Sequence, residues 1–186
     1  ALRTARDAAR GEWLLLVPVD SVPAPALLRD YLAAREGVDT VVGYRPERVG
    51  YPTWARLGSR VMHAMVSTLF GLRLRDYNWI CLYRVERLRQ IDWRERSIAF
   101  LPEILAGLSA LGCRFAEVPS PMEERRTGQA TVFRPATATR GFAGLLRVKW
   151  RAAGPAGRLL ALAFLAAVGL RFAALERHDL WVDEAI

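Results

Sequence analysis

The sequence has few cysteines, and nothing in it suggests a covalent framework. Cys81 and Cys113 are the two cysteines among 186 residues. They are too few and too far apart for a set of disulfides or a metal knuckle, so we expect two core thiols. Internal repeats, low-complexity segments and a recognisable signal peptide are also absent. These absences argue against a disulfide-stapled domain and against a repeat protein.

Acidic residues are scarce relative to basic ones. The chain has 19 Asp and Glu against 27 Lys and Arg, a net charge of +8. Such a charge suits nucleic acid, an anionic membrane surface or a phosphate-rich substrate equally well. The aromatic residues are scattered at core spacings and form no basic-aromatic platform, so we expect no nucleic-acid partner.

The longest run of mainly apolar residues, 159–175, lies near the C-terminus and is interrupted only by Arg171. As a helix it would be about 25 Å long, and we predict a transmembrane helix over 158–176. Basic residues gather before it, in a juxtamembrane segment over 136–157 that we expect to hold an amphipathic helix at the membrane surface. The positive-inside rule then places the N-terminal part in the cytoplasm, at the inner or plasma membrane, and residues 177–186 outside.

Before this region the pattern is that of an α/β domain, over residues 1–135. Apolar runs at 13–17 and 38–43 flank a helical segment at 25–35, which predicts a β-α-β unit. Further along we expect a helix from Thr53 to Gly71, a strand near 80–83, a helix ending at Gly112 and a strand over 113–118, with a loop at 123–139. In the Thr53 helix, we expect Thr53 as the cap and five apolar residues in the core: Trp54, Leu57, Val61, Met65 and Leu69.

Asp20 follows the first predicted strand, at the edge where open α/β sheets bind ligands. One carboxylate can help to hold Mg²⁺ when substrate phosphates and water complete its coordination. The alternative is an Asp that caps the next helix, and composition alone favours that alternative.

Asp76 and Asn78 lie one residue apart in a loop between apolar segments. An ionised Asp76, with Arg75 beside it, could orient an acceptor or a metal, while Asn78 could donate a hydrogen bond. The alternative is an Asx turn that leads into a strand. Glu103 is a further candidate acid, although the helix dipole favours an acid near a helix start in any case.

Guanidinium groups match phosphate oxygens, so several arginines are candidates for phosphate binding. Most surface arginines are only solvated, and we expect two or three at most to touch substrate. The candidates are Arg45, Arg56, Arg60, Arg125 and Arg126.

Many short motifs stand together in a characteristic order. They are Gly11 to Leu16, Asp20, Val42 to Arg45, Arg56, Ser59-Arg60, Phe70 to Leu72, Arg75-Asp76, Leu82 to Arg84, Glu103 to Leu105, Glu117 to Pro119, and Arg125 with Gly128. Through them, residues 1 to about 135 resemble family-2 glycosyltransferases of the dolichyl-phosphate or polyprenyl-phosphate mannosyltransferase type. The resemblance implies a partial GT-A fold, a Rossmann-like three-layer sandwich. It also implies sugar transfer from a nucleotide-sugar donor to a polyprenyl phosphate, with Mg²⁺ or Mn²⁺ as cofactor.

The chain departs from that family at several points. The usual Asp-X-Asp is Pro18-Val19-Asp20, the Ser-Gly-Phe type sequence is Asn78-Trp79-Ile80, and the usual Ser-Lys is Ala130-Thr131. The family's first strand and nucleotide-base pocket have no counterpart in this sequence. We therefore expect a fragment of a larger protein that does not bind a nucleotide sugar well on its own.

The C-terminal residues carry a second resemblance. Leu170-Arg171-Phe172 followed by Leu180 to Ala185 is similar to the first helix and outer loop of multi-pass GT-C transferases. By that resemblance Asp183, and after it Glu184, would be the catalytic base or a metal contact. The alternative is a simple anchor helix with a charged flank.

The sequence therefore predicts a membrane-associated glycosyltransferase that makes a polyprenyl-phosphate sugar. The rival hypothesis is a non-catalytic, membrane-tethered module that keeps the fold but has a degenerate metal site, as Pro18 would suggest.

Overall fold

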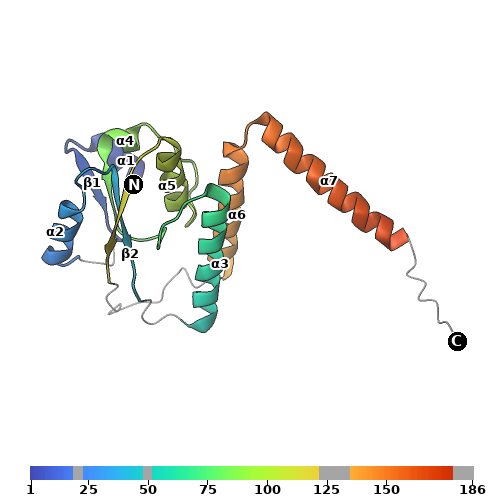
Figure 1. The fold of residues 1–186 in the computed structure, drawn as a ribbon, viewed down its shortest axis with the longest axis horizontal. Coiled ribbons are helices and arrows are strands. Elements are labelled where there is room, and N and C mark those ends of the chain that lie inside the picture. Colours follow the sequence, from blue (N-terminus) through green and yellow to red (C-terminus); the bar gives the residue numbers. More distant parts are fainter. Residues whose placement is uncertain (19–22, 48–51, 122–134, 178–186) are drawn as a thin grey trace. The chain divides into compact units, whose positions relative to one another are not determined.

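A four-stranded mixed sheet organises the N-terminal part of the chain (Figure 1). The computed structural model describes residues 1–18, 23–47, 52–121 and 135–177. The chain divides into two units, residues 1–148 and 149–186. The sheet, the helices that cover it and the site all belong to the first unit.

The strand order is β1-β3-β2-β4, formed by Trp13–Leu16, Cys81–Arg84, Thr40–Tyr44 and Phe115–Pro119. β3 is antiparallel to both β1 and β2, and β4 is parallel to β2. β1 and β2 thus run in the same direction, as the predicted β-α-β unit requires, but β3 lies between them. The carboxyl ends of β1, β2 and β4 share one edge of the sheet, and the chain enters β3 at that same edge.

Helices cover both faces of the sheet in three layers. α2 (Pro25–Ala33) packs on one face, where Tyr31 meets Val41 and Leu82. The other face carries α3 (Thr53–Phe70), α4 (Val85–Arg89) and α5 (Phe100–Ala110) over Val42 and Cys81. Neighbouring residues of one strand point to opposite faces, so Val41 and Val42 enter different cores. The predicted three-layer α/β architecture is confirmed.

Two of the expected helix ends are correct. Gly71 follows α3 with φ 69°, and Gly112 follows α5 with φ 73°. Both lie in the left-handed region that glycine adopts most easily, which ends a helix without strain. The predicted Thr53 cap is wrong, because Pro52 is the cap residue and Thr53 is already helical with no side-chain cap bond.

Three of the five apolar residues expected in the core of α3 are exposed: Trp54, Leu57 and Val61, by 56%, 62% and 45%. The other two, Met65 and Leu69, are partly buried and pack against the core, as predicted. The fully buried residues of α3 are Ala55, Met62 and Val66. α3 carries apolar residues on two faces, and periodicity alone does not tell which face meets the sheet.

α6 (Pro135–Ala152) begins within the segment predicted as a loop, and it packs on the first unit through small residues. A methyl group on Gly144 would lie 2.5 Å from Ser97 Oγ and 3.0 Å from Ala99 Cβ, so the helix backbone approaches the loop before α5 closely. Arg147 then pairs with the buried Glu95, Nη2 to Oε1 at 3.1 Å.

The second unit contains α7 (Pro155–Arg177). Its Arg158 side chain donates hydrogen bonds to the carbonyl oxygens of Trp150 and Arg151. Over the described residues, no helix has both the length and the apolar character needed to cross a membrane. The transmembrane helix predicted over 158–176 is therefore not confirmed. The uninterrupted apolar run between Arg158 and Arg171 has only 12 residues. A typical transmembrane helix has about 20 consecutive apolar residues.

The close approach at Gly144 predicts opposite effects for two glycine substitutions within helices. Gly144→Ala should lower the free energy of unfolding by about 1 to 3 kcal/mol, because the added methyl group forces Ser97 and Ala99 apart. Gly58→Ala on α3 should raise it by about 0.5 to 1 kcal/mol, since nothing lies within 4 Å of the added atom and alanine favours the helix. Urea unfolding followed by circular dichroism measures both, and equal effects would contradict the packing at α6.

Glu95 should make the attachment of α6 sensitive to acid. Burial alone would raise the pKa of Glu95, but hydrogen bonds from the Arg147 side chain and from the amides of Ser97 and Arg96 lower it from 4.5 to about 2. A depressed folded-state pKa means that this stability is fully present above about pH 4.5 and is lost as the pH falls toward 2. Glu95→Gln should flatten that part of the profile of unfolding free energy against pH.

Candidate functional site

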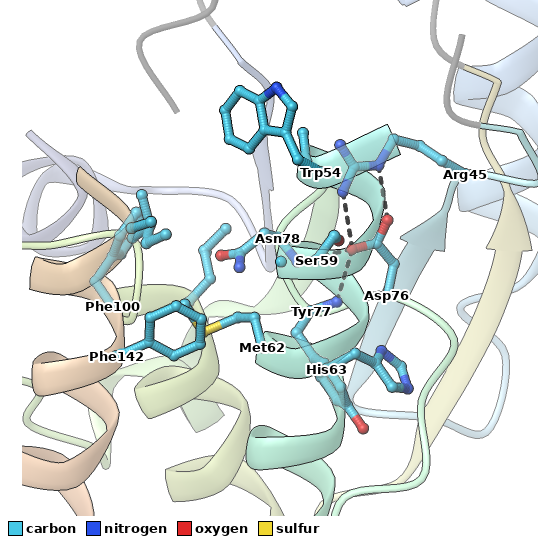
Figure 2. Close-up of a pocket in the computed structure, with 15 residues that line it drawn as sticks. Arg45, Trp54, Ser59, Met62, His63, Asp76, Tyr77, Asn78, Phe100 and Phe142 are labelled. Atoms are coloured by element: carbon cyan, nitrogen blue, oxygen red, sulfur yellow. Dashed lines mark hydrogen bonds and ion pairs between the residues drawn. The ribbon is translucent and has the colours of Figure 1, made fainter. Parts of the chain in front are cut away.

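A pocket of about 300 Å³ lies between α3, the loop before β3, the residues that lead into α5, and α6 (Figure 2). One end of it is polar, with Arg45, Asp76 and Asn78. The remaining walls are mainly apolar. Figure 2 shows Met62, Phe100 and Phe142 together, away from the Arg45 and Asp76 side chains. The pocket thus suits a molecule with one polar and one apolar part.

The polar end is built on the carboxyl edge of the sheet. Arg45 directly follows β2, and Asp76 lies in the loop that leads into β3. Because these two strands are neighbours, residues 31 positions apart in sequence meet there. The Arg45 Nε donates to Asp76 Oδ2 at 2.7 Å and its Nη2 to Oδ1 at 3.1 Å. The guanidinium and the carboxylate thus form a bidentate pair.

This ion pair is buried. The side chains of Arg45 and Asp76 are 8% and 4% exposed. The Arg45 guanidinium also stacks over Trp79, with its carbon 4.7 Å from the ring centroid. A buried charge pair is tolerated only when further contacts compensate for lost hydration, and the stacked ring and hydrogen bonds supply such contacts.

Asp76 also organises its own loop. Its Oδ1 accepts hydrogen bonds from the backbone N–H groups of Tyr77 at 2.9 Å and Asn78 at 3.1 Å. This is an Asx turn, the alternative prediction for Asp76, and it coexists with the ion pair. The carboxylate therefore fixes the position of Asn78, which lines the pocket.

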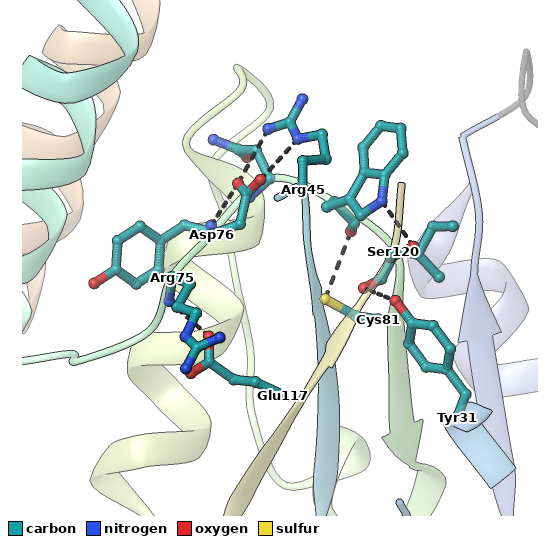
Figure 3. Close-up of polar contacts among 11 residues, drawn as sticks. Tyr31, Arg45, Arg75, Asp76, Cys81, Glu117 and Ser120 are labelled. Carbon is teal, nitrogen blue, oxygen red and sulfur yellow. Dashed lines mark hydrogen bonds and ion pairs between the residues drawn. The ribbon is translucent and has the colours of Figure 1, made fainter. Parts of the chain in front are cut away.

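Arg75 does not take the part predicted for it beside Asp76. The guanidinium that pairs with Asp76 is that of Arg45, whereas Arg75 stacks over the Tyr44 ring at 4.6 Å. The Arg75 backbone N–H donates to Glu117 Oε1 at 2.6 Å (Figure 3). Adjacent side chains in an extended loop point in different directions, so proximity in sequence misled the prediction here.

A hydrogen bond holds the Trp79 ring, over which Arg45 stacks. The Trp79 Nε1 donates to Ser120 Oγ at 2.9 Å, and this bond connects the loop before β3 to the end of β4. The Tyr31 hydroxyl donates to the Ile80 carbonyl at 3.2 Å (Figure 3). Nearby, burial raises the pKa of Cys81 to about 12, so its thiol stays protonated. Cys81 and Cys113 are both buried and unbridged, which confirms the predicted core thiols.

His63 is a pocket residue that the sequence did not single out. It extends from α3 and packs on Tyr77, with ring centroids 4.6 Å apart and an interplanar angle of 37°. Tyr77 is anchored in turn, because its hydroxyl donates to the Leu72 carbonyl at 2.8 Å. His63 follows Ser59 by four residues on the same face of α3, and both line the pocket. That helical spacing was the available signal.

The other predicted site residues either lie away from the pocket or fall outside the described residues. Arg56 and Arg60 are exposed on α3 and do not line the pocket. Glu103 lies in the first turn of α5, where its Oε2 accepts the backbone N–H groups of Arg94 and Glu95. It holds the loop before α5 and does not line the pocket. Outside the described residues are Asp20, Arg125, Arg126, Asp183 and Glu184.

A metal ion held by protein side chains alone needs several ligands close together, and the described residues offer no such cluster. In the part of the chain that the structure describes, no three His, Cys, Asp or Glu side chains gather in a way that could hold a metal ion. At the pocket both Asp76 oxygens already accept hydrogen bonds. The described side chains thus do not fit a metal, and Asp20, the predicted ligand, lies outside them.

In sequence, neither a protein-family model nor a curated protein matches the chain. In structure, it is similar to crystal structures of glucosyl-3-phosphoglycerate synthase from Mycobacterium tuberculosis. The complex with UDP superposes with a TM-score of 0.57 and 19% identity over 80% of this chain and 53% of that chain. The complex with Mn²⁺, UDP-glucose and phosphoglyceric acid superposes with a TM-score of 0.58 and 19% identity over 80% of this chain and 53% of that chain. For the complex with Mn²⁺, UDP-glucose and glycerol 3-phosphate, the TM-score is 0.56 and the identity 19%, over 79% of this chain and 53% of that chain.

These comparisons confirm the predicted GT-A fold. The chain spans about half the length of the enzyme that it matches. The likeness concerns the arrangement of strands and helices, and at 19% identity it shows the fold alone.

The burial of the Arg45–Asp76 pair predicts a large and specific loss of stability when one partner is removed. Asp76→Ala should lower the free energy of unfolding by about 3 to 5 kcal/mol, because it leaves a buried guanidinium without its carboxylate. Replacing both residues, Arg45→Met with Asp76→Ala, should recover part of that loss. The control is Glu12→Gln, which removes an exposed pair with Arg84 at 3.5 Å and should cost less than about 1 kcal/mol. A loss at Asp76 as small as that at Glu12 would contradict the buried pair.

Proposed function

We propose that this chain is part of a glycosyltransferase that moves a sugar from a nucleotide-sugar donor to a polyprenyl phosphate. The observation that carries the proposal is the division of the pocket into a polar end and apolar walls. A polyprenyl phosphate has the same division, a charged head on an isoprenoid chain. The likeness to a solved sugar transferase supports the reaction class.

The arrangement of Asp76 favours an acceptor that is already ionised. Its two oxygens accept hydrogen bonds from Arg45 and from two backbone amides. A carboxylate held in this way positions its neighbours better than it takes up a proton. A phosphate acceptor needs no proton removed, whereas a hydroxyl acceptor benefits from a general base. The proposed role of Asp76 is therefore to orient Arg45 and Asn78 toward the phosphate.

In the proposed reaction an oxygen of the lipid phosphate attacks the anomeric carbon of the donor sugar. A new carbon–oxygen bond forms to the lipid phosphate, and the bond to the nucleoside diphosphate breaks, so that group leaves with the electron pair. Positioning and charge neutralisation contribute most of the rate in such a transfer. Arg45 and Asn78 would hold the acceptor, with the apolar walls around its first isoprenoid units.

The remaining predictions complete this proposal. Asp20 would help to hold Mg²⁺ or Mn²⁺, which neutralises a diphosphate leaving group when bound, and Arg125 would contact phosphate. In the proposal, Arg56 and Arg60 would contact phosphate and Glu103 would be a further candidate acid. Asp183 would be the candidate acid of the last ten residues. The proposed location is the inner or plasma membrane, with residues 1–150 on its cytoplasmic side.

The rival is a non-catalytic module with the same fold. Pro18, which stands where the first acid of an Asp-X-Asp would be, favours it. The experiment below separates the two, because a module without activity transfers sugar to no acceptor.

The test compares acceptors and pocket variants in the protein that contains this chain. Prenyl phosphates of increasing chain length should be used with falling acceptor KM, whereas phosphoglyceric acid should not be glycosylated. Phe142→Ala should raise the KM for the long prenyl phosphate about tenfold and leave the donor KM unchanged. Leu32→Ala, an exposed site on α2, is the control.

Three results would count against this proposal. Transfer to a hydroxyl acceptor in place of prenyl phosphate would refute the acceptor class. An equal rise of both KM values in Phe142→Ala would refute the assignment of the apolar wall to the acceptor. The absence of transfer with every nucleotide sugar and acceptor tested would favour the non-catalytic module.

A further inference from the structure

The exposed apolar stripe of α3 is unusual for a helix that also packs against a sheet. Trp54, Leu57 and Val61 follow one another at spacings of three and four, so they share one side of the helix. They are 56%, 62% and 45% exposed, while Ala55, Met62 and Val66 bury the side toward the sheet. Contiguous exposed apolar residues on one helix mark an interaction surface.

α6 repeats this arrangement beside α3. Leu145 is fully buried and Gly141 and Gly144 approach the core, whereas Leu146 is 56% exposed. The two helices lie side by side (Figure 1), and a methyl group on Gly141 would lie 3.0 Å from the Met62 side chain.

Both helices contribute residues to the pocket. Trp54, Gly58 and Met62 of α3 line it, and so do Ala138 and Phe142 of α6. In α3, Leu57 and Val61 lie beyond Trp54 on the side away from the sheet. In α6, Leu146 lies one turn after Phe142, also away from the core. We call Trp54, Leu57, Val61 and Leu146 the α3–α6 face, of which Trp54 lines the pocket.

The charge around this face has one sign. Neither Thr53–Phe70 nor Pro135–Ala152 contains an Asp or Glu. Arg56 and Arg60 are exposed on α3, and Arg140 is exposed on α6. Apolar residues flanked by arginines characterise helices that lie in the plane of an anionic bilayer surface, with guanidinium groups at the level of the lipid phosphates.

We infer that the α3–α6 face binds the surface of an anionic lipid bilayer, with α3 and α6 lying in the interface. Trp54 belongs both to the face and to the pocket wall, so the face borders the pocket. When the α3–α6 face binds a bilayer, the pocket lies next to the lipid, and the lipid acceptor of the proposed function is in that bilayer. The inference deepens that function but concerns binding, so it can be tested without any activity.

The experiment reads lipid contact at single positions of the full chain. Leu57→Cys and Leu146→Cys are each labelled with an environment-sensitive fluorophore, and Leu32→Cys on α2, itself 48% exposed, is the matched control. The native Cys81 and Cys113 are buried, and the labelled unsubstituted chain measures their background. Vesicles contain phosphatidylglycerol with phosphatidylcholine, or phosphatidylcholine alone, with or without brominated acyl chains.

We expect the labels at positions 57 and 146 to shift to shorter wavelength on anionic vesicles and to be quenched by brominated lipid. The label at position 32 should do neither. Arg60→Gln with Arg140→Gln should weaken the vesicle affinity read by the label at 57 about fivefold for each charge removed. Arg29→Gln with Arg35→Gln, exposed charges in and after α2, should leave it unchanged.

Three outcomes would overturn the inference. If the chain sediments with vesicles while the labels at 57 and 146 stay as in solution, another segment binds the lipid. If these labels shift without vesicles as the protein concentration rises, the face is covered by a second copy of the chain. Loss of sugar transfer in an otherwise vesicle-bound chain would refute the proposed function alone. Sugar transfer by a chain that does not bind anionic vesicles would refute this inference alone.

Discussion

The Arg45–Asp76 ion pair is the interaction on which the site depends. Two charges with side-chain exposures of 8% and 4% lose most of their hydration, and one hydrogen bond would not compensate for that loss. The compensation comes from two guanidinium contacts, two backbone amides and the Trp79 ring. Together they hold the loop before β3 in one conformation, so one wall of the pocket is set by electrostatics.

The sheet topology makes that pair possible. Local sequence patterns predicted all four strands, because apolar runs bounded by turn residues are a local signal. The position of β3 between β1 and β2 is non-local, and no run of residues encodes it. For this reason the sequence placed Asp76 in a loop correctly but paired it with Arg75, its neighbour in the chain. The true partner, Arg45, comes from the adjacent strand in space.

The helices show the same limit in another form. The glycine stops at Gly71 and Gly112 were predictable, because a left-handed residue at a helix end is a property of the local backbone. The orientation of α3 was not, since two of its faces are apolar and both have helical spacing. His63 was missed for the same reason. A histidine on a helix is recognised as a site residue only when one knows that it packs on Tyr77 and lines the same pocket as Asp76.

α6 connects the pocket to the α3–α6 face. Phe142 lines the pocket and Leu146 lies one turn further, on the exposed side of the same helix. Gly144 and the Glu95–Arg147 pair hold that helix against the loop before α5. These contacts fix the rotation of α6 about its axis. If the helix turned, a larger side chain would take the place of Gly144 and would clash with the loop before α5. The contacts that fix the pocket wall therefore also fix which side of α6 is exposed, so the pocket and the proposed membrane surface keep a constant relation to each other.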